Sequence, residues 1–515
     1  MGGIAENEKT IRSVLSAQAA RMPDKVFVHA IDQARDLTYG QLWRLGNRIA
    51  QALAARGIGA NDRVLMLSEN SIEFVAVFLG VVRAGATIAT ANVEMNRAHL
   101  AEIVRAVAPR LILCQEGLGL EELCAGTGVE PLALGEWREA GGSTGFFAEL
   151  ERFDAEADIE PVCRPNDFAV IFYTSGTEAK PKGVLQTHWA VWHNFDAVAD
   201  AVELDEDDRV LDCRSYTWLS AQNMSLGAPL FRGATVCMAK HFSRSRYFDW
   251  VKAYRITMGV SVPTILNMFL NEPVPVHGRD VTHLRFLMTS SAPMLPEQWR
   301  RFEDTYGILV CQSAGCSEGG LMCSHRGTRR RIGTIGEPLK YQEIRLLDPK
   351  GNEVPRGEAG EMVVSGPMRS WGYLHWDGRM EKLPDSGHRT GDLAAMDEHG
   401  HIRIVGRLKD QIIRGGVNVS PVEVDNVLAE HPDIEEAAAV GVPHQIYGEE
   451  VVAYVVPRDG ARLTADSVRA HCAVKLAFFK QPKEVFFTDS LPRNERGKLD
   501  RKSLAARWKR DHNAA

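Results

Sequence analysis

Nothing in this 515-residue sequence marks a highly charged partner or a membrane. The formal net charge is only -7, so the chain has no basic excess with which to bind nucleic acid or an anionic bilayer. The longest apolar run, Phe74–Val82, ends at Arg83 and is too short to span a membrane. The opening MGGIAENEKT contains no apolar signal segment, and Glu6 stands where a myristoylation signal needs Ser or Thr. We therefore expect a cytoplasmic protein with neither nucleic-acid nor membrane partners.

Cysteine is sparse and scattered, with nine residues and no Cys-x-x-Cys pair. Such spacing predicts neither a disulfide framework nor a zinc site. Cys311, Cys316 and Cys323 lie close together in the sequence, but no base stands beside them. We expect the cysteines to be small buried thiols.

Short apolar runs alternate with helical patterns through the first part of the chain. A capping box at Thr38 opens an amphipathic pattern that stops at Gly57. The run RVLML (63–67) is typical of a strand buried on both faces, and SENSIEFVAVFLGVVRAG (68–85) follows as a helix. This alternation predicts an α/β fold with a largely parallel sheet, and the length predicts at least two domains.

Two changes of pattern divide the rest of the chain. From about Ile344, short strands separated by Gly and Pro indicate an antiparallel, barrel-like region. After Arg407 a Ser-Pro helix start at Ser420 and an apolar run at 437–440 indicate a small α/β domain. We therefore expect domains at residues 1–406 and 407–515, the second of which fits the usual size range of a domain.

A pattern suited to phosphate follows the apolar run 168–172. Binding phosphate requires free backbone N–H groups, hydroxyl groups and a cation. The segment YTSGTEAKPKGV supplies all three through Thr174, Ser175, Gly176, Thr177, Lys180, Lys182 and Gly183. It is not a Walker loop, and an ordinary surface turn rich in Ser, Thr and Gly is the alternative interpretation.

Three weaker signals lie downstream. HRTGDLA places Asp392 after a glycine, where its carboxylate suits a ribose diol. CQSAGCSEGG places Ser317 and Glu318 beside glycines, and a carboxylate there suits Mg²⁺. LPRNERGKLDR places Lys498 on a glycine-containing loop. Taken singly, each is more typical of a turn or a solvated charge.

The order of these motifs is more informative than any one of them. YTSGTxxxPKG, xGxSE, TGD, GRLKDQIIRGGVNVSPxEV and LPRxxxGKxxR resemble the signature series of the adenylate-forming superfamily, over nearly the whole chain. That superfamily contains acyl-CoA synthetases, firefly luciferase and nonribosomal peptide adenylation domains. The resemblance implies a large N-terminal domain of doubly wound α/β subdomains plus a distorted β-barrel. It also implies a small mobile α+β C-terminal domain.

The resemblance implies a two-step reaction as well. A carboxylate attacks the α-phosphate of ATP to give acyl-AMP and pyrophosphate, and a thiol then displaces AMP. Mg²⁺ is needed for the first step, and CoA is the expected thiol. The substrates would be a carboxylic acid and CoA.

Residue roles follow from the same resemblance. Thr174 to Thr177 and Lys182 would belong to the phosphate loop, and Glu318 would hold magnesium. The expected nucleotide contacts are Ala314, Gly315, Ser317, Asp392 and Arg407. Lys498 would contact the attacking carboxylate and the α-phosphate, where its charge stabilises the transition state.

Movement of the C-terminal domain is also implied. Lys409 matches the hinge about which this domain would rotate to withdraw Lys498. The same rotation would present the loop Arg414 to Asn418, whose Gly415 and Gly416 would line the pantetheine channel.

The sequence departs from the family pattern at the nucleotide. Glu178 and Ala179 stand where Thr-Gly is commonest, and a carboxylate ~4 Å from a phosphate oxygen is repelled by ~4 kcal/mol at an effective dielectric constant of about 20. Ala314 stands where an aromatic residue usually stacks on adenine, a contact worth ~1–3 kcal/mol. Trp218 occupies the place of a histidine or aromatic gate near the thiol tunnel.

Three functions stay open at this point. A complete carboxylate–CoA ligase is the favoured interpretation. The second is a specialist that mainly thioesterifies a preformed acyl-adenylate made by a partner ligase. The third is a non-catalytic acyl-binding relative, which the intact Lys498, Asp392 and Arg407 disfavour. A homodimer is open too.

The acid itself is defined only as a class. Its pocket is expected around Tyr216, Trp218, Val262, Ser290, Ser291 and Ala292. The small side chains leave room for apolar, bulky acids, and nothing marks a partner for an amino group.

Overall fold

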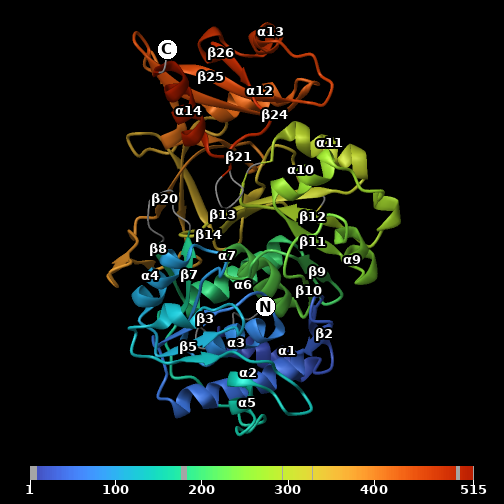
Figure 1. Ribbon diagram of the computed structural model, residues 1–515, viewed down its shortest axis with the longest axis vertical. Coiled ribbons are helices and arrows are strands. Elements are labelled where there is room, and N and C mark those ends of the chain that lie inside the picture. The colour runs from blue at the N-terminus through green and yellow to red at the C-terminus, as the bar shows by residue number, and fades with distance from the viewer. Residues whose placement is uncertain (1–8, 175–181, 293, 328, 494–498, 514–515) are drawn as a thin grey trace.

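The structure is a computed structural model that describes residues 9–174, 182–292, 294–327, 329–493 and 499–513. Figure 1 shows the N-terminal segments, blue to green, in the lower part of the molecule, and the C-terminal segments, orange to red, as a separate unit at the top. None of the described helices combines the length and apolar composition needed to cross a bilayer. The α/β fold with a separate small C-terminal domain is confirmed.

The first sheet is parallel at its centre and antiparallel at one edge. Within the described part of the chain it has eight strands, in the order β19-β18-β8-β7-β4-β3-β5-β6. Their bounds are β3 Arg63–Leu67, β4 Thr87–Thr90, β5 Leu111–Cys114, β6 Pro131–Ala133, β7 Phe168–Thr174, β8 Lys182–Thr187, β18 Gly372–Leu374 and β19 Met380–Lys382. β18 comes from far along the chain and pairs Tyr373 with Val184 of β8. The edge beside the candidate phosphate loop therefore joins two distant parts of the sequence.

The local signals near the N-terminus form the predicted helices. The Thr38 capping box is present: its hydroxyl accepts from the Gln41 N–H, and the Gln41 side chain accepts from the Thr38 N–H. It opens α2 (Tyr39–Ala55), which ends just before Gly57 at φ +66°. The apolar run forms α3 (Ile72–Arg83), which is buried along its whole length.

The second sheet contains nine strands among the described residues, in the order β15-β14-β13-β12-β11-β9-β10-β1-β2. Their bounds are β1 Val26–Ala30, β2 Arg35–Thr38, β9 Arg209–Asp212, β10 Thr235–Met238, β11 Met258–Ser261, β12 Phe286–Thr289, β13 Val310–Cys316, β14 Gly320–Ser324 and β15 Glu337–Pro338. Its centre is parallel, and β13–β14 is an antiparallel hairpin. Helix α6 (His188–Ala201) contacts β7 and β8 of the first sheet and β14 of the second, so it holds the two sheets together.

Shorter elements complete this N-terminal part. The α-helices are α1 Ile11–Arg21, α4 Arg97–Val107, α5 Gly145–Leu150, α7 Leu219–Ala221, α8 Ala228–Arg232, α9 Tyr247–Ala253, α10 Pro263–Asn271 and α11 Pro296–Tyr306. A π-helical segment, Gln222–Gly227, joins α7 to α8, and short 3₁₀ turns span Glu121–Cys124 and Gly278–Asp280.

The region expected as a distorted barrel contains an antiparallel sheet in the order β16-β17-β20-β21. These strands are β16 Glu343–Leu347, β17 Ala359–Ser365, β20 His388–Met396 and β21 Ile402–Arg407. Its hydrophobic cluster includes Met322 and Cys323 of β14, so the sheet packs against the end of the second sheet.

The C-terminal unit has its own sheet, order β23-β22-β25-β24, with β26 beside β25. Its elements are β22 Ile412–Arg414, β23 Val417–Val419, α12 Pro421–Ala429, β24 Ile434–His444, β25 Gly448–Pro457, α13 Ala465–Lys475, a 3₁₀ turn Phe478–Lys480, β26 Glu484–Phe487 and α14 Arg501–Asn513. The predicted helix after Ser420 is confirmed. The Ser420 hydroxyl donates to the Val405 carbonyl and makes no capping hydrogen bond to the helix.

Candidate active site

The candidate phosphate loop joins two antiparallel strands. Thr174 is the last residue of β7 and pairs with Lys182, the first residue of β8. The strands therefore fix both ends of the loop at one place, beside β18. Six of the loop residues named from the sequence, together with the expected catalytic lysine, lie outside the described residues: Ser175, Gly176, Thr177, Glu178, Ala179, Lys180 and Lys498.

Tyr373 contacts both Glu318 and Lys182, the first residue of β8. It stands in the turn between β13 and β14, and its Oε1 accepts a hydrogen bond of 2.7 Å from the Tyr373 hydroxyl. Lys182 Nζ lies 5.6 Å from the centroid of the Tyr373 ring. Burial, and then the charge of Glu318, raises the pKa of Tyr373, so the phenol stays protonated and can donate. The fold thus brings together two residues that the sequence predicts for phosphate and metal.

Hydrogen bonds from Ser370 hold the turn that carries Glu318. Ser370 donates its hydroxyl to the Ser317 carbonyl (2.7 Å) and its N–H to the Glu318 carbonyl (2.8 Å). At Gly315 an added Cβ would meet the Gly320 carbonyl oxygen at 2.5 Å, so only glycine fits this hairpin. Because its backbone is fixed on both sides, the turn presents the Glu318 side chain in a defined direction.

Ala314 lies on the same hairpin but faces an apolar environment. It pairs with Cys323 of β14 and packs, half-buried, against the hydrophobic cluster of the antiparallel sheet. A methyl group offers no aromatic face on which a base could stack. The structure therefore supplies no substitute for the usual stacking residue at this position.

Asp392 and Arg407 are neighbours across β20 and β21. They stand opposite each other in the strand register, and Arg407 Nε donates to Asp392 Oδ1 at 2.5 Å. This hydrogen bond raises the pKa of the Arg407 guanidinium, which stays charged. The Thr390 hydroxyl accepts from the Asp392 N–H (3.1 Å) and donates to the Met362 carbonyl (2.9 Å). The expected ribose pair is thus assembled.

Lys409 lies in a short 3₁₀ turn, Leu408–Asp410, that joins β21 to the C-terminal unit. Its side chain is exposed. Beyond it, Gly415 and Gly416 form the exposed tip of the β22–β23 hairpin, with φ of +59° and +83°. The Gly415 N–H donates to the Tyr447 carbonyl at 2.8 Å. The two glycines thus belong to the C-terminal unit, across the expected hinge from Asp392.

The six residues expected around the acid have different environments. Tyr216 is fully buried, with its ring edge-on to Phe74 at 6.4 Å, and belongs to the hydrophobic cluster that the first and second sheets share. Ser290 is buried and accepts a hydrogen bond of 3.3 Å from Arg214. Trp218 and Val262 are half-buried.

The other two residues expected around the acid, Ser291 and Ala292, directly follow Ser290 in the sequence. Ser291 is exposed and has a φ of +75°, which is uncommon for a residue other than glycine. The Ala292 carbonyl accepts from the Gln312 side-chain amide at 2.8 Å, which ties this segment to β13. The segment 290–292 is therefore held close to the hairpin that carries Glu318.

A buried ion pair that was not among the predicted site residues lies beside Ser290. The Arg214 guanidinium donates to both oxygens of Asp212, at 2.8 to 3.2 Å, and also to Ser220 (3.1 Å). The Asp212 carboxylate also accepts from the Ser225 hydroxyl. Burial, the largest single effect, lowers the pKa of Arg214, but the charge and the hydrogen bonding of Asp212 act together against it, and the pKa is raised overall. The signal was visible in LDCRSYTW, where two opposite charges follow an apolar strand.

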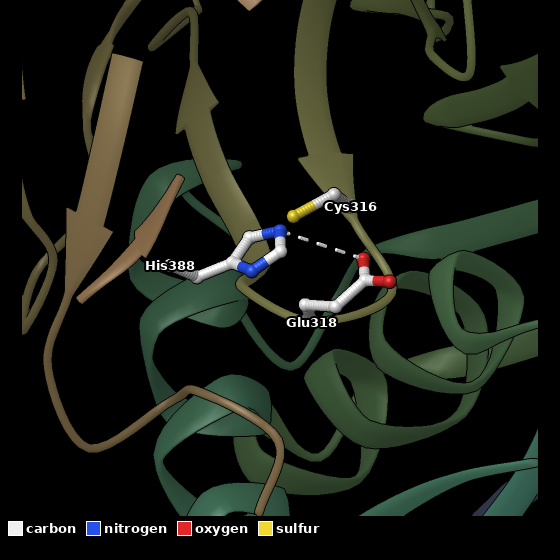
Figure 2. Close-up of side chains that lie close together, drawn as sticks. All are labelled: Cys316, Glu318 and His388. Carbon is white, nitrogen blue, oxygen red and sulfur yellow. Dashed lines mark ion pairs between the residues drawn. The ribbon is translucent and has the colours of Figure 1, made fainter. Parts of the chain in front are cut away.

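A second missed group surrounds Glu318. Figure 2 shows Cys316, Glu318 and His388 pointing toward one another, and one donor atom of each lies within 4.8 Å of the other two. His388 Nε2 is 3.8 Å from Glu318 Oε2, and burial lowers the pKa of His388. Cys316 is half-buried, whereas Cys311 and Cys323 are buried as expected. No base stands beside Cys316 in the sequence, but the fold brings His388 close to it from another strand.

Comparisons with known proteins identify the family of the chain. The chain matches the model of the AMP-binding enzyme over residues 15–374 and that of the AMP-binding enzyme C-terminal domain over residues 423–498. It is 33% identical to a sulfoacetate–CoA ligase of Cupriavidus necator, with 96% of this chain and 97% of that protein covered. It is 32% identical to a feruloyl-CoA synthase of an Amycolatopsis species, over 90% of this chain and 92% of that protein.

A solved structure resembles the whole chain. The crystal structure of ATP-bound MatB from Rhodopseudomonas palustris has a TM-score of 0.87 and 28% identity, with 97% of this chain and 99% of that chain covered. Because the family models and the full-length relatives agree, the chain belongs to the AMP-binding enzyme family, among the CoA ligases of the adenylate-forming superfamily.

Proposed function

We propose that this protein is a carboxylate–CoA ligase that first makes an acyl-AMP from ATP and then transfers the acyl group to CoA. The observation that carries the proposal is the convergence of Lys182, Tyr373 and Glu318 at the ends of the β7–β8 hairpin. A cation and a carboxylate held within reach of one tyrosine form a site for a phosphate chain and its counter-ion.

The residues have separate roles in this proposal. The phosphate loop that begins at Thr174 and ends at Lys182 contacts the phosphates through N–H groups, hydroxyl groups and the lysine charge. Asp392 accepts the ribose hydroxyl groups, and Arg407 orients that carboxylate. Lys498 stabilises negative charge that develops as the carboxylate attacks the α-phosphate.

Glu318 fits Mg²⁺. Its Oε1 is held by Tyr373, and carboxylate oxygens are the ligands that a hard divalent cation prefers. When bound, the cation supplies positive charge against the phosphate oxygens. Tyr373 orients the carboxylate for this task, as a residue behind a metal ligand does.

The second step uses the C-terminal domain, whose boundary we place at residue 407. Rotation about Lys409 withdraws Lys498 and brings the hairpin tip, Gly415 and Gly416, toward the acyl-AMP. Glycine at the tip leaves room for the pantetheine arm. We place the reaction in the cytoplasm, where the nine unpaired cysteines of the described chain stay reduced.

One observation favours a second candidate, a thioesterification specialist. Ala314 packs on the core of the antiparallel sheet and offers no stacking face, which lowers the affinity for ATP by ~1–3 kcal/mol relative to an aromatic residue. Acyl-AMP brings binding energy from its acyl part, so the second step is less sensitive to this loss.

The experiment uses the full chain and a panel of acids that includes aromatic acids such as ferulate and small anionic acids such as sulfoacetate. Acid-dependent ATP–pyrophosphate exchange supports the complete ligase. Thioester formed only from synthetic acyl-AMP and CoA supports the specialist. If neither appears with any acid, the protein is not a ligase of the tested classes.

A matched pair of variants tests the catalytic lysine. Lys498→Ala should lower exchange by ~10²–10³, the usual cost of removing one charge-stabilising donor. Lys502→Ala, at an exposed position near the start of α14, should leave exchange close to the wild-type rate. Undiminished exchange in Lys498→Ala would contradict the proposed role.

A further inference from the structure

Cys316, Glu318 and His388 form a donor set unlike the one that Mg²⁺ requires. Magnesium is bound through oxygen atoms, whereas sulfur, imidazole nitrogen and one carboxylate oxygen are typical ligands of zinc-class cations. The three side chains come from the end of β13, the following turn and the start of β20. No pattern in the sequence predicts them as a site, because they are brought together by the fold.

The distances are compatible with one shared ion. The three donor atoms lie within 4.8 Å of one another, and Glu318 Oε2 is 3.8 Å from His388 Nε2. Around a tetrahedral zinc ion such donors stand roughly 3.3–3.8 Å apart, because Zn–N is ~2.0 Å and Zn–S is ~2.3 Å. Side chains on a turn can move by about an ångström, and such a movement would bring the three donor atoms to the distances that zinc requires.

The surrounding contacts prepare these ligands. Tyr373 occupies Glu318 Oε1, which leaves Oε2 facing His388. The Gly319 N–H donates to Cys316 Sγ at 3.1 Å, which fixes the direction of the sulfur atom. Burial and the charge of Glu318 raise the pKa of the Cys316 thiol, so a cation binds there by displacing the thiol proton. Outer contacts of this kind orient metal ligands and raise their affinity.

From these contacts we infer that Cys316, Glu318 and His388 bind a zinc-class cation, with a fourth position open to water or a phosphate oxygen. The consequence for activity rests on the proposed function, because the same Glu318 is the proposed magnesium ligand. Zinc bound here takes that carboxylate away from Mg²⁺·ATP and stops adenylation. Thioesterification of a preformed acyl-AMP, which needs no metal at the β- and γ-phosphates, continues.

The binding test needs no substrate. The full chain is stripped with a chelator, dialysed and titrated with Zn²⁺, and in parallel with Co²⁺ as an optical probe. We expect one equivalent per chain and a thiolate-to-cobalt charge-transfer band. Cys316→Ser should lose this band, and His388→Gln should weaken binding by at least ~10-fold, since loss of a mere outer contact already costs that much.

Cys163→Ser is the matched control, because Cys163 is also half-buried but lies far from Glu318 in the chain. It should bind zinc and cobalt as the wild type does. The circular dichroism of each variant establishes that it is folded. If folded Cys316→Ser keeps the charge-transfer band, or if the wild type binds no more zinc than Cys316→Ser, the site does not exist.

The activity test compares each protein with itself, with and without zinc, at fixed Mg²⁺·ATP. Zinc should inhibit exchange in the wild type and in Cys163→Ser, and added Mg²⁺ should relieve the inhibition. Exchange in Cys316→Ser and His388→Gln should be at least ~10-fold less sensitive to zinc.

The two proposals fail separately. Zinc binding without any exchange would sustain the metal site and overturn adenylation. Exchange without zinc binding would overturn the metal site and sustain adenylation.

Discussion

At the scale of single residues, Asp212 and Arg214 form a buried ion pair. Both side chains are almost wholly removed from solvent, at 0% and 3% exposure. Such a pair is tolerated because each partner compensates the other and the surrounding serines complete the hydrogen bonds. Removal of one partner leaves an uncompensated charge in a medium of low dielectric constant.

Asp212→Asn should therefore lower the free energy of unfolding by ~3–5 kcal/mol, measured by denaturant titration. The double replacement Asp212→Leu with Arg214→Met should recover most of this loss, because neither charge is then buried. Asp459→Asn, at an exposed turn position, is the control and should stay within ~0.5 kcal/mol of wild type. A loss below ~1 kcal/mol in Asp212→Asn would show that the pair is not buried as described.

His325 should make stability depend on pH. Burial lowers its pKa from 6.5 to about 3. Its Nδ1 accepts from the Gln312 N–H (3.0 Å) and Nε2 faces the Thr334 hydroxyl (2.8 Å), which fixes the neutral ring. Between pH 6.5 and 3 the unfolded chain binds a proton that the folded chain does not, so acidification in this window favours unfolding.

From pH 7 to pH 5 this one group should lower the free energy of unfolding by about 2 kcal/mol. Denaturant titrations at the two pH values measure it. His325→Gln should lose this part of the pH dependence, whereas His399→Gln, at an exposed position, should keep it. Equal pH dependence in the wild type and His325→Gln would refute the assignment.

Local motifs in the sequence identified Glu318, Asp392 and Arg407, because each lies in a short recognisable segment. The residues that contact them could be predicted from the sequence only in part. Asp392 and Arg407 are 15 residues apart and were both found, but Tyr373 is 55 residues from Glu318 and belongs to no motif. The meeting of His388 with Cys316 likewise depends on the packing of β20 against β13, which no local pattern encodes.

At the scale of elements, the β22–β23 hairpin carries a local sequence signal, although the segment was expected only as the loop Arg414 to Asn418. Two consecutive glycines between short apolar runs favour a tight turn, and the structure has both at positive φ. An added Cβ at Gly416 would meet no atom within 4 Å, so a substitution there costs only backbone strain. Helix starts such as Thr38 were also predictable, whereas the place of β18 beside β8 was not, since register across sheets depends on tertiary contacts.

Gly416→Ala should destabilise the C-terminal unit by ~1–2 kcal/mol, the cost of the left-handed conformation for a residue with a Cβ. Thioester formation from acyl-AMP should slow more than pyrophosphate exchange, because the hairpin tip is proposed to act only in the second step. Gly59→Ala, where φ is not in the left-handed region and an added Cβ also meets open space, is the control. An equal slowing of both steps would contradict the proposed role of the hairpin.

At the scale of the whole molecule, the hydrophobic cores divide at the proposed boundary. In the part of the chain that the structure describes, every hydrophobic cluster either ends by Ile404 or begins at or after Ile412. Contacts between the halves include those of α12 with β21 and α11. A core that does not cross the boundary is what independent folding and rotation of a domain require.

Residues 407–515, expressed alone, should therefore fold and unfold cooperatively, as measured by circular dichroism on heating. The intact chain should show a corresponding separate transition by calorimetry. Residues 460–515 alone, which leave out α12 and the two long strands β24 and β25, are the control and should not fold. A 407–515 fragment without cooperative unfolding would place the domain boundary elsewhere.

The pairing of β18 with β8 has a consequence for biosynthesis. Chains emerge from the ribosome N-terminus first, at about 5–20 residues per second, so β8 is made long before residues 372–374. Until they arrive, the outer side of β8 is an open row of backbone donors and acceptors, the kind of edge that recruits other nascent chains. Translation of this protein should therefore include an interval of dependence on chaperones, and products of premature termination between Thr187 and Gly372 should aggregate rather than accumulate as soluble fragments.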